Sequence, residues 1–291
     1  GLNEAVAKGS KVVLMNDANL PAGDYTIPSG VTLLIPCDDA NTLYTTAPGT
    51  TNQSTHAVPT AYRTLTMAAG ANLIINGAMS LSAVQNSASG RSAPYGPTSF
   101  IQMQSGSNIT VNNGGKLYAW GFIQGSGSVT VKSGGTAYEC FQLMDWRGGD
   151  NTSGMVGNKQ RVFPMSQYYI QNIEVPMTLY SGATEYAYTT IFMQDTDFGS
   201  AVGFISNKDA MFNLTSGYVV KKYDGATDRL IVEAYGDMTF SSINMTVGTS
   251  SINSKNYDLP INSNLTVHVH EGTITMNQDL ALLPGAKIII D

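Results

Sequence analysis

Charged residues are scarce in this chain. Asp, Glu, Lys and Arg together make up 12% of its 291 residues, against about 25% in an average soluble domain. No run of Lys and Arg occurs, so the sequence lacks the electrostatic footprint of a nucleic-acid-binding protein, and we expect no nucleic-acid partner. The formal net charge of −6 is scattered along the chain, which also excludes an acidic interaction tail.

Long apolar runs are missing too. None approaches the roughly 18 residues of a membrane-spanning helix, and the first residues lack the charged and then apolar pattern of a signal peptide. We therefore expect no membrane insertion within this segment. The chain starts abruptly at Gly1 and stops at Asp291 just after an apolar run, so we expect a piece excised from a longer surface protein.

Cysteine is rare. Cys37 and Cys140 lie far apart in the sequence. Two buried free thiols are the simpler interpretation, and a disulfide between them stays open because it requires their two coils to be adjacent.

Glycine, by contrast, is abundant, with 30 residues, and it recurs at regular places. The stretch 101–135 shows the pattern, in which each short alternation of apolar and polar residues is followed by two polar residues and a glycine. Such alternation is typical of half-buried strands, and glycine after Asn or Ser is typical of tight turns. The glycines of the full pattern are Gly30, Gly70, Gly106, Gly114, Gly134, Gly217 and Gly285.

The spacing of these glycines indicates a stack of coils. Gly114 and Gly134 are 20 residues apart, and Gly30 and Gly70 are 40 apart. A period near 20 with irregular insertions is typical of a parallel β-helix, in which apolar positions recur from coil to coil while turn lengths vary. We therefore predict an all-β chain, one domain over residues 1–291, with the helix-compatible residues 2–8 as an end cap.

The pattern is interrupted in the middle of the chain. Residues 145–235 are richer in aromatic and charged residues than the rest, and we expect an elaborated, irregular insertion there. Within it, two longer alternating runs flank Asp224-Gly225, a pair typical of hairpin turns, which predicts a hairpin projecting from the stack.

The runs LNEAVAKGSKVVLMND, YTIPSGVTLLIP and ITVNNGGKLYAWGFIQGSGSVTVKSGG together resemble bacterial secreted or cell-surface proteins with right-handed parallel β-helix repeats. These belong to the pectin-lyase-like fold group. The resemblance implies a right-handed β-solenoid in an extracellular or cell-surface setting. It implies no activity, because the group includes lyases, hydrolases, phage tailspikes and adhesins.

Acidic and basic side chains that could act in catalysis occur in two places. Asp145 and Arg147 stand close together, as a polysaccharide lyase would require of a carboxylate and a base. Asp195 and Asp197 would share one face of an extended run, as the paired carboxyl groups of a glycoside hydrolase could. The Gly-His-Gly turn and Arg-x-Lys run of the family's hydrolases do not occur, so catalysis stays the alternative hypothesis.

His268 and His270 flank Val269 and would share the solvent face of a strand. No third ligand close in the sequence shares that face, since Glu271 would point the other way. We therefore predict no metal site, and no motif calls for a cofactor.

Aromatic residues of the middle region could form a binding face. Exposed rings can stack on sugars, whereas buried ones would fill the core of the insertion, and both interpretations stay open. The candidate ligand-binding residues are Trp146, Tyr168, Tyr169, Tyr186 and Tyr188.

We interpret the chain as an adhesin-like or structural β-solenoid at the cell surface. Its expected partner is a polysaccharide, or a host or cell-surface glycan or protein, bound through the middle insertion. The alternative is a carbohydrate-active enzyme of the same fold, either a polysaccharide lyase or a glycoside hydrolase.

Overall fold

The structure is a computed structural model of the whole chain. It describes residues 1–36, 63–81, 99–146, 168–171, 173–194, 202–208, 212–224, 229–240, 244–247, 255–258, 265–276 and 287–291. Cys37 lies outside these residues, and the side chain of Cys140 is not among those described. Both interpretations of the two cysteines, free thiols and a disulfide, therefore stay open.

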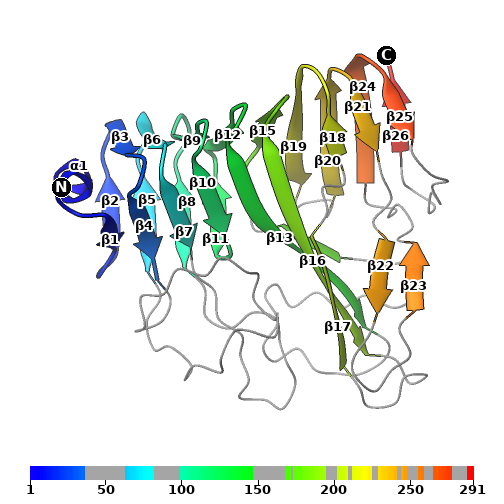
Figure 1. Cartoon of the computed structure of the whole chain (residues 1–291), viewed down its shortest axis with the longest axis horizontal. Coiled ribbons are helices and arrows are strands. Elements are labelled where there is room, and N and C mark those ends of the chain that lie inside the picture. Colours follow the sequence, from blue (N-terminus) through cyan, green and yellow to red (C-terminus); the bar gives the residue numbers. More distant parts are fainter. Residues whose placement is uncertain are drawn as a thin grey trace.

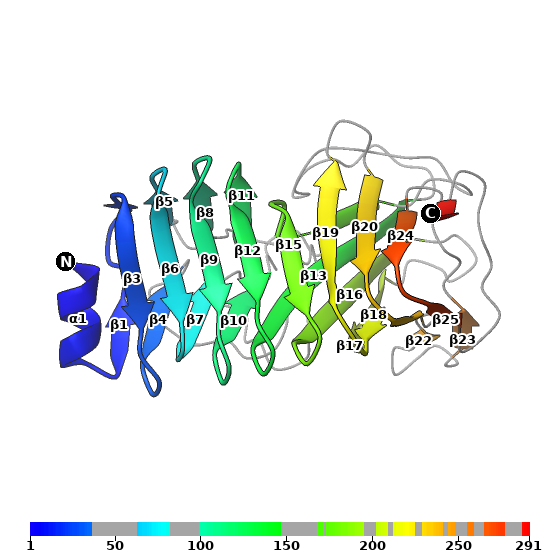
Figure 2. The ribbon, with the colours of Figure 1, turned by 90° about the horizontal axis from the view of Figure 1, so that it is seen from above.

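Three sheets, here named A, B and C, run along a stack of strands (Figures 1 and 2). Sheet A contains, in spatial order, β1 (Lys11–Val13), β4 (Thr32–Ile35), β7 (Ala78–Leu81), β10 (Lys116–Ala119), β13 (Thr136–Trp146), β16 (Thr184–Gln194) and β17 (Val202–Lys208), with β14 (Tyr168–Gln171) paired to β13. Sheet B contains β2 (Ala18–Leu20), β5 (Thr64–Met67), β8 (Phe100–Met103) and β11 (Phe122–Gly125).

Sheet C is the longest of the three. It contains β3 (Gly23–Ile27), β6 (Ala71–Ile75), β9 (Asn108–Val111), β12 (Ser128–Val131), β15 (Met177–Tyr180), β19 (Tyr218–Asp224), β20 (Arg229–Tyr235), β24 (Leu265–Glu271) and β26 (Lys287–Ile290). Two small sheets complete the description: β18 (Phe212–Leu214) with β21 (Met238–Phe240) and β25 (Ile274–Met276), and β22 (Asn244–Val247) with β23 (Lys255–Asp258).

The chain visits the sheets in the repeating order B, C, A. The path β8–β9–β10 is followed directly by β11–β12–β13, and each strand pairs in parallel with its counterpart one coil earlier. Stacked parallel strands of this kind confirm the all-β prediction and are compatible with a β-solenoid. Of the glycines expected at corners, those at positions 30, 70, 106, 114 and 134 stand in turns with φ between +77° and +80°, and Gly217 has φ of +68°. Gly285 lies outside the described residues.

Inward rows of aliphatic side chains form the core, because residues in register stack directly on one another from coil to coil. One row of sheet C runs Tyr25, Leu73, Ile109, Val129, Met177, Lys221, Val232, Val267 and Ile288. The two facing rows of sheet A run Leu33, Met79, Leu117, Ala137, Glu185, and Ile35, Leu81, Ala119, Glu139.

Outward rows are polar and hydrogen-bonded along the stack. Asn108 Nδ2 donates to Asn72 Oδ1 over 3.2 Å, and Asn112 donates to Asn76 over 2.9 Å. Uncharged amides can stack in this way without the repulsion that a row of like charges would create, which accounts for the scarcity of charge in the sequence.

Strand direction changes in the second half of the stack. β15 and β19 are antiparallel, as are β16 and β17, before parallel pairing resumes between β20 and β24. β13 and β16 also run on beyond the stack at its lower edge in Figure 1, where β17 joins them. β19 and β20 pair as the hairpin predicted around Asp224, but they do not project, because both are continuous members of sheet C (Figure 2).

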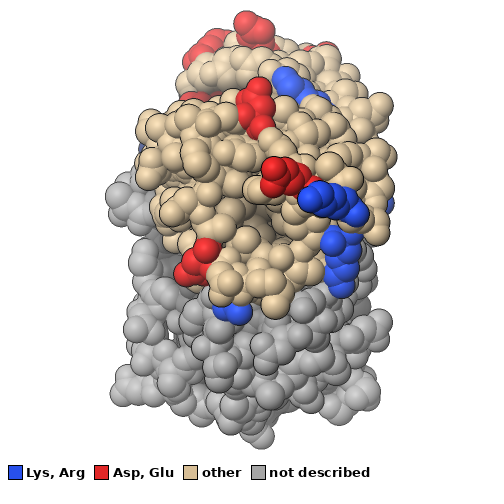
Figure 3. Space-filling view, turned by 90° about the vertical axis from the view of Figure 1, so that its left-hand side faces the viewer, with Lys and Arg blue, Asp and Glu red and all other residues tan. Residues whose placement is uncertain are grey.

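The helix α1 (Leu2–Lys8) lies beside β1 and β3 at the N-terminal end (Figure 2). Val6 is buried, the side chain of Asn3 donates to the carbonyl of Asp24 over 3.0 Å, and the helix ends at Gly9 in extended backbone. Charged side chains are sparse and of mixed sign on this end of the molecule (Figure 3). No helix within the described ranges is long and apolar enough to cross a membrane.

Candidate functional site

A strip of stacked rings runs along the outer face of sheet C. Tyr180, Tyr218 and Tyr235 stand opposite one another on β15, β19 and β20, and we call them the tyrosine strip. The ring centroids of Tyr180 and Tyr218 are 5.6 Å apart, and those of Tyr218 and Tyr235 are 4.8 Å apart with an interplanar angle of 19°. His270 continues the stack, 4.7 Å from Tyr235.

Strand alternation places these rings outward. The neighbouring residues Leu179, Val219 and Ala234 are buried in an inward row of sheet C, so the tyrosines beside them must face the other way. A register shift between β20 and β24 leaves His270 without a partner in the strand ladder. A β-bulge re-aims a side chain in this way, and here it turns the imidazole toward Tyr235.

A groove lies beside Tyr180, along the corners where the chain passes from sheet C to sheet A. It encloses about 560 Å³. Lys132 Nζ lies 4.2 Å above the centre of the Tyr180 ring, within cation–π range. The side chain of Tyr180 stays 36% exposed. The groove is lined by Asn112, Asn113, Lys132, Ser133, Tyr180, Ser181 and Gly217.

These groups suit a ligand that is apolar on one side and rich in hydroxyls on the other. The stacked tyrosines offer apolar ring edges, each with a hydroxyl. The amides of Asn112 and Asn113 both donate and accept hydrogen bonds, the serines do likewise, and Lys132 adds a cation. Stacked rings bordered by amides and hydroxyls are the chemistry that recognises a sugar.

A second cluster joins β24 to the end of β26. His268 Nε2 lies 2.8 Å from one carboxylate oxygen of Asp291, and His270 Nδ1 lies 2.7 Å from the other. These three residues place ligand atoms within 4.8 Å of one another. Imidazole nitrogen and carboxylate oxygen are ligands that zinc accepts, so the cluster could hold a divalent cation.

The sequence predicts two members of that cluster but not the third. Val267 and Val269 face the core, and the two histidines face outward, as the alternation indicates. Asp291 is 21 residues from His270 in the chain. Asp291 reaches the two histidines only because β26 pairs with β24. The local sequence does not indicate that pairing.

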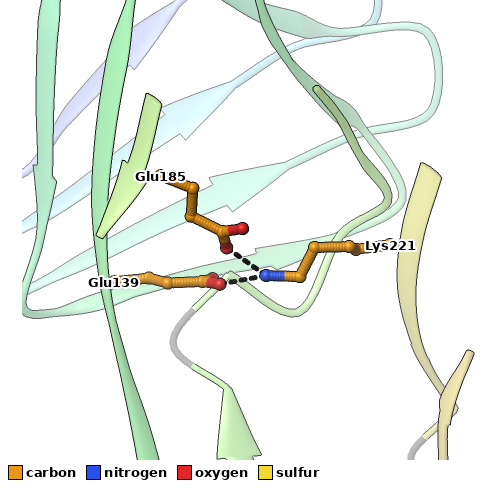
Figure 4. A network of polar contacts seen from close by, with 3 residues as sticks. All are labelled: Glu139, Glu185 and Lys221. Atoms are coloured by element: carbon orange, nitrogen blue, oxygen red, sulfur yellow. Dashed lines mark hydrogen bonds and ion pairs between the residues drawn. The ribbon is translucent and has the colours of Figure 1, made fainter. Parts of the chain in front are cut away.

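A buried charged triad lies in the core between sheets C and A (Figure 4). Lys221 Nζ contacts a carboxylate oxygen of both Glu139 and Glu185, and the three side chains are 1%, 0% and 5% exposed. Figure 4 shows the lysine of sheet C reaching the two glutamates of sheet A. The sequence gives no warning of this triad, because each residue sits in a run that reads as an ordinary strand.

Burial and mutual contact set the charge states of the triad. Burial raises the pKa of the Glu139 carboxyl well above its ordinary value. Burial acts in the same direction on Glu185, but the charge of Lys221 and hydrogen bonds from Glu139 and Lys221 outweigh it, and the pKa of Glu185 is lowered. Burial would lower the pKa of Lys221, yet the two glutamates raise it. Burial thus favours the neutral form of Glu139, whereas the contact with Lys221 favours the charged form of Glu185.

Among the aromatic residues predicted to bind ligand, Tyr186 is the one whose side chain is described. It stacks on Tyr138 at 5.1 Å, which stacks on Tyr118 at 4.5 Å, along the outer face of sheet A. Tyr188 stands two residues further along β16 with its side chain undescribed. The tyrosine strip on sheet C was not singled out among the middle-region aromatics, because nothing in the local sequence sets its members in register.

The remaining predicted residues are placed by backbone alone or not at all. Asp145 and Trp146 end β13, and β14 brings Tyr168 opposite Met144 and Tyr169 opposite Leu143. The side chains of these residues lie outside the described part of the structure. Arg147, Asp195 and Asp197 lie outside the described residues altogether. The predicted pairing of Asp145 with Arg147, and that of Asp195 with Asp197, therefore stay predictions.

Comparison of the chain with protein-family models, with curated proteins and with solved structures found no match.

Proposed function

We propose that this protein is a right-handed β-solenoid displayed outside the cell, with α1 covering its N-terminal end, and that it binds a polysaccharide. The ligand lies on the tyrosine strip and enters the groove beside Tyr180. Binding rather than catalysis is the function, and the rest of the stack is scaffold.

The observation that carries the proposal is the adjacency of the strip and the groove. Three stacked tyrosines present a row of ring edges and hydroxyls along the stack, and the groove adds amide, hydroxyl and ammonium groups at one end of it. A row of rings on successive strands matches a polymer of sugar rings better than a single small molecule, because the same ring edge and hydroxyl recur from strand to strand.

The cell-surface setting rests on the resemblance of the repeats and on composition. Stacked Asn, Gln, Ser and Thr in outward rows give a hydrated surface with little charge, and the apolar side chains are withdrawn into the inward rows. The alternative function is a carbohydrate-active enzyme with Asp145, Arg147, Asp195 and Asp197 as its acids and base, which would bind the same ligands but turn them over.

Affinity electrophoresis against a panel of soluble polysaccharides tests the proposal. We expect the wild-type protein to be retarded by at least one of them, and Tyr180→Ala to weaken Kd by about tenfold or more, as removal of an aromatic anchor does. Tyr180→Phe keeps the ring and should retain most of the affinity.

The matched control is Gln124→Ala. Gln124 stands in an outward row of another sheet, where its side chain bonds to Gln102 over 2.9 Å, so its removal should leave retardation unchanged. Equal retardation of wild type and Tyr180→Ala would exclude the strip as the binding face.

A further inference from the structure

The buried triad sits where the core should hold aliphatic side chains. Lys221 occupies the sheet C row between Met177 and Val232, and Glu139 follows Ala119 in a sheet A row. Met177, Val232 and Ala119 are all buried and apolar. Burying three ionisable groups in such surroundings is costly, and apolar residues of similar volume are often equally or more stable.

The arrangement has the parts needed for an amide-forming reaction. A desolvated lysine amine is a nucleophile once it loses its proton, and the carbonyl carbon of a protonated carboxyl is a better electrophile than that of a carboxylate. Lys221 Nζ contacts a carboxylate oxygen of both glutamates, and all three side chains are almost fully buried. Nucleophile, electrophile and base therefore meet within one water-excluded contact.

We propose that Lys221 and Glu139 become joined by an intramolecular amide bond, with Glu185 as the base. The Lys221 ammonium first gives one proton to the Glu185 carboxylate. The neutral Nζ then attacks the side-chain carbonyl carbon of Glu139, which carries the proton of its acid. The C–N bond forms, the C–O bond to the hydroxyl breaks, and the second proton of Nζ leaves with that hydroxyl as water. No oxidant, metal or second substrate is required.

The product removes the charges that made the triad costly. The ion pair becomes a neutral amide and a neutral Glu185 carboxylic acid, which suits the apolar rows better. The released water is lost to bulk solvent. Hydrolysis of the amide would need water to re-enter the buried site, which opposes the reverse reaction. The bond also ties together residues 82 positions apart, on facing sheets. A cross-link over so long a loop restricts the unfolded chain strongly, and it would hold the stack together where strand direction changes.

Intact-mass spectrometry of the denatured 291-residue chain tests the proposal directly. We expect the wild-type mass to fall below the sequence mass by one water molecule. Proteolysis should release a branched peptide in which the segment containing Lys221 is joined to the one containing Glu139. A wild-type mass equal to the sequence mass would overturn the proposal, as would water loss mapped to any other residues.

Three variants separate the roles. Lys221→Met and Glu185→Gln should both show the full sequence mass, the first for lack of a nucleophile and the second for lack of a base. The exposed pair Lys222–Glu233, 2.6 Å apart, is the matched control, and Glu233→Gln should keep the water loss. A branch on Glu185, or water loss that persists in Glu185→Gln, would overturn the assignment of Glu139 as electrophile and Glu185 as base. If a variant folds poorly, the wild-type mass and the branched peptide still decide whether the amide bond forms.

Discussion

Single residues decide where this regular stack departs from regularity. Lys221 interrupts a row of aliphatic side chains, and His270 is displaced from the strand ladder by a bulge. Both departures lie on sheet C beyond β15, and the tyrosine strip runs from β15 into the same region. Such departures are rare in the described core, whose rows elsewhere consist mainly of Ile, Leu, Val, Met and Ala. The unusual residues therefore mark the part of the stack in which function is to be sought.

The lowered pKa of Asp291 predicts how the stability of the C-terminal strand pairing changes at low pH. Its pKa is held below the ordinary value, chiefly by the hydrogen bond from His268 and then by that from His270. A carboxyl whose folded pKa is lowered stabilises the fold above its unfolded pKa, and that contribution is lost as the pH falls through the lowered value. We therefore expect the pairing of β26 with β24 to weaken progressively as the pH falls from the ordinary pKa of aspartate through the lowered pKa of Asp291.

A carboxyl NMR titration measures this pKa directly. We expect the Asp291 resonance to titrate below the ordinary aspartate value in the wild-type protein, and His268→Ala to move its midpoint upward. A midpoint unaffected by His268→Ala would show that the hydrogen bond does not exist in solution.

At the scale of elements, the corner turns make the stack possible. Gly114 and Gly115 are neighbours in one turn, but they are glycine for different reasons. Gly114 has φ of +77° and open space around the position of a Cβ, whereas a Cβ on Gly115 would lie 2.1 Å from the carbonyl oxygen of Ile75. That oxygen already accepts a hydrogen bond from the Asn112 amide, so it cannot move away without breaking the contact between coils.

This difference predicts a split among substitutions in the turn. Gly114→Ala should cost about 1–2 kcal/mol for its left-handed backbone, and Gly114→Asn less, because Asn tolerates that conformation. Gly115→Ala should reach or exceed the about 1–3 kcal/mol of an overpacked site. Denaturant midpoints of the three variants measure the order. A Gly115→Ala variant as stable as Gly114→Asn would contradict the close stacking of corners.

Sequence reasoning predicts the repeated elements well and the exceptional ones poorly. The corner glycines and the inward alternation around Ile109 and Val111 follow from local pattern, because the same physical demand recurs in every coil. The placement of Lys221 does not, since its run looks like half-buried hairpin strand, and only the pairing of β19 with β15 turns its side chain into the core. The approach of Asp291 to His268 is non-local in the same way.

The whole molecule combines a repetitive scaffold with a specialised second half. Sheets A and C run through both parts and enclose one continuous core. The buried triad lies within that core, and the strip and the groove lie on the surface of the sheets around it. The parallel coils from β2 to β12 present outward rows of amides and hydroxyls, whereas the later strands of sheet C present tyrosine and histidine. This division predicts that ligand affinity depends on the later strands of sheet C and on the corners that line the groove. The rest of the surface of the earlier coils can then be altered without loss of binding.

The claim that the protein binds a polysaccharide without turning it over has one direct test. The polysaccharide that retards the protein most in affinity electrophoresis is incubated with it, and the mixture is assayed both for bound protein and for newly formed reducing or unsaturated ends. We predict retained protein and an end count equal to that of the polysaccharide alone, with retention lost in Tyr180→Ala. Release of new ends by the wild-type protein in proportion to time would contradict the account and identify an enzyme.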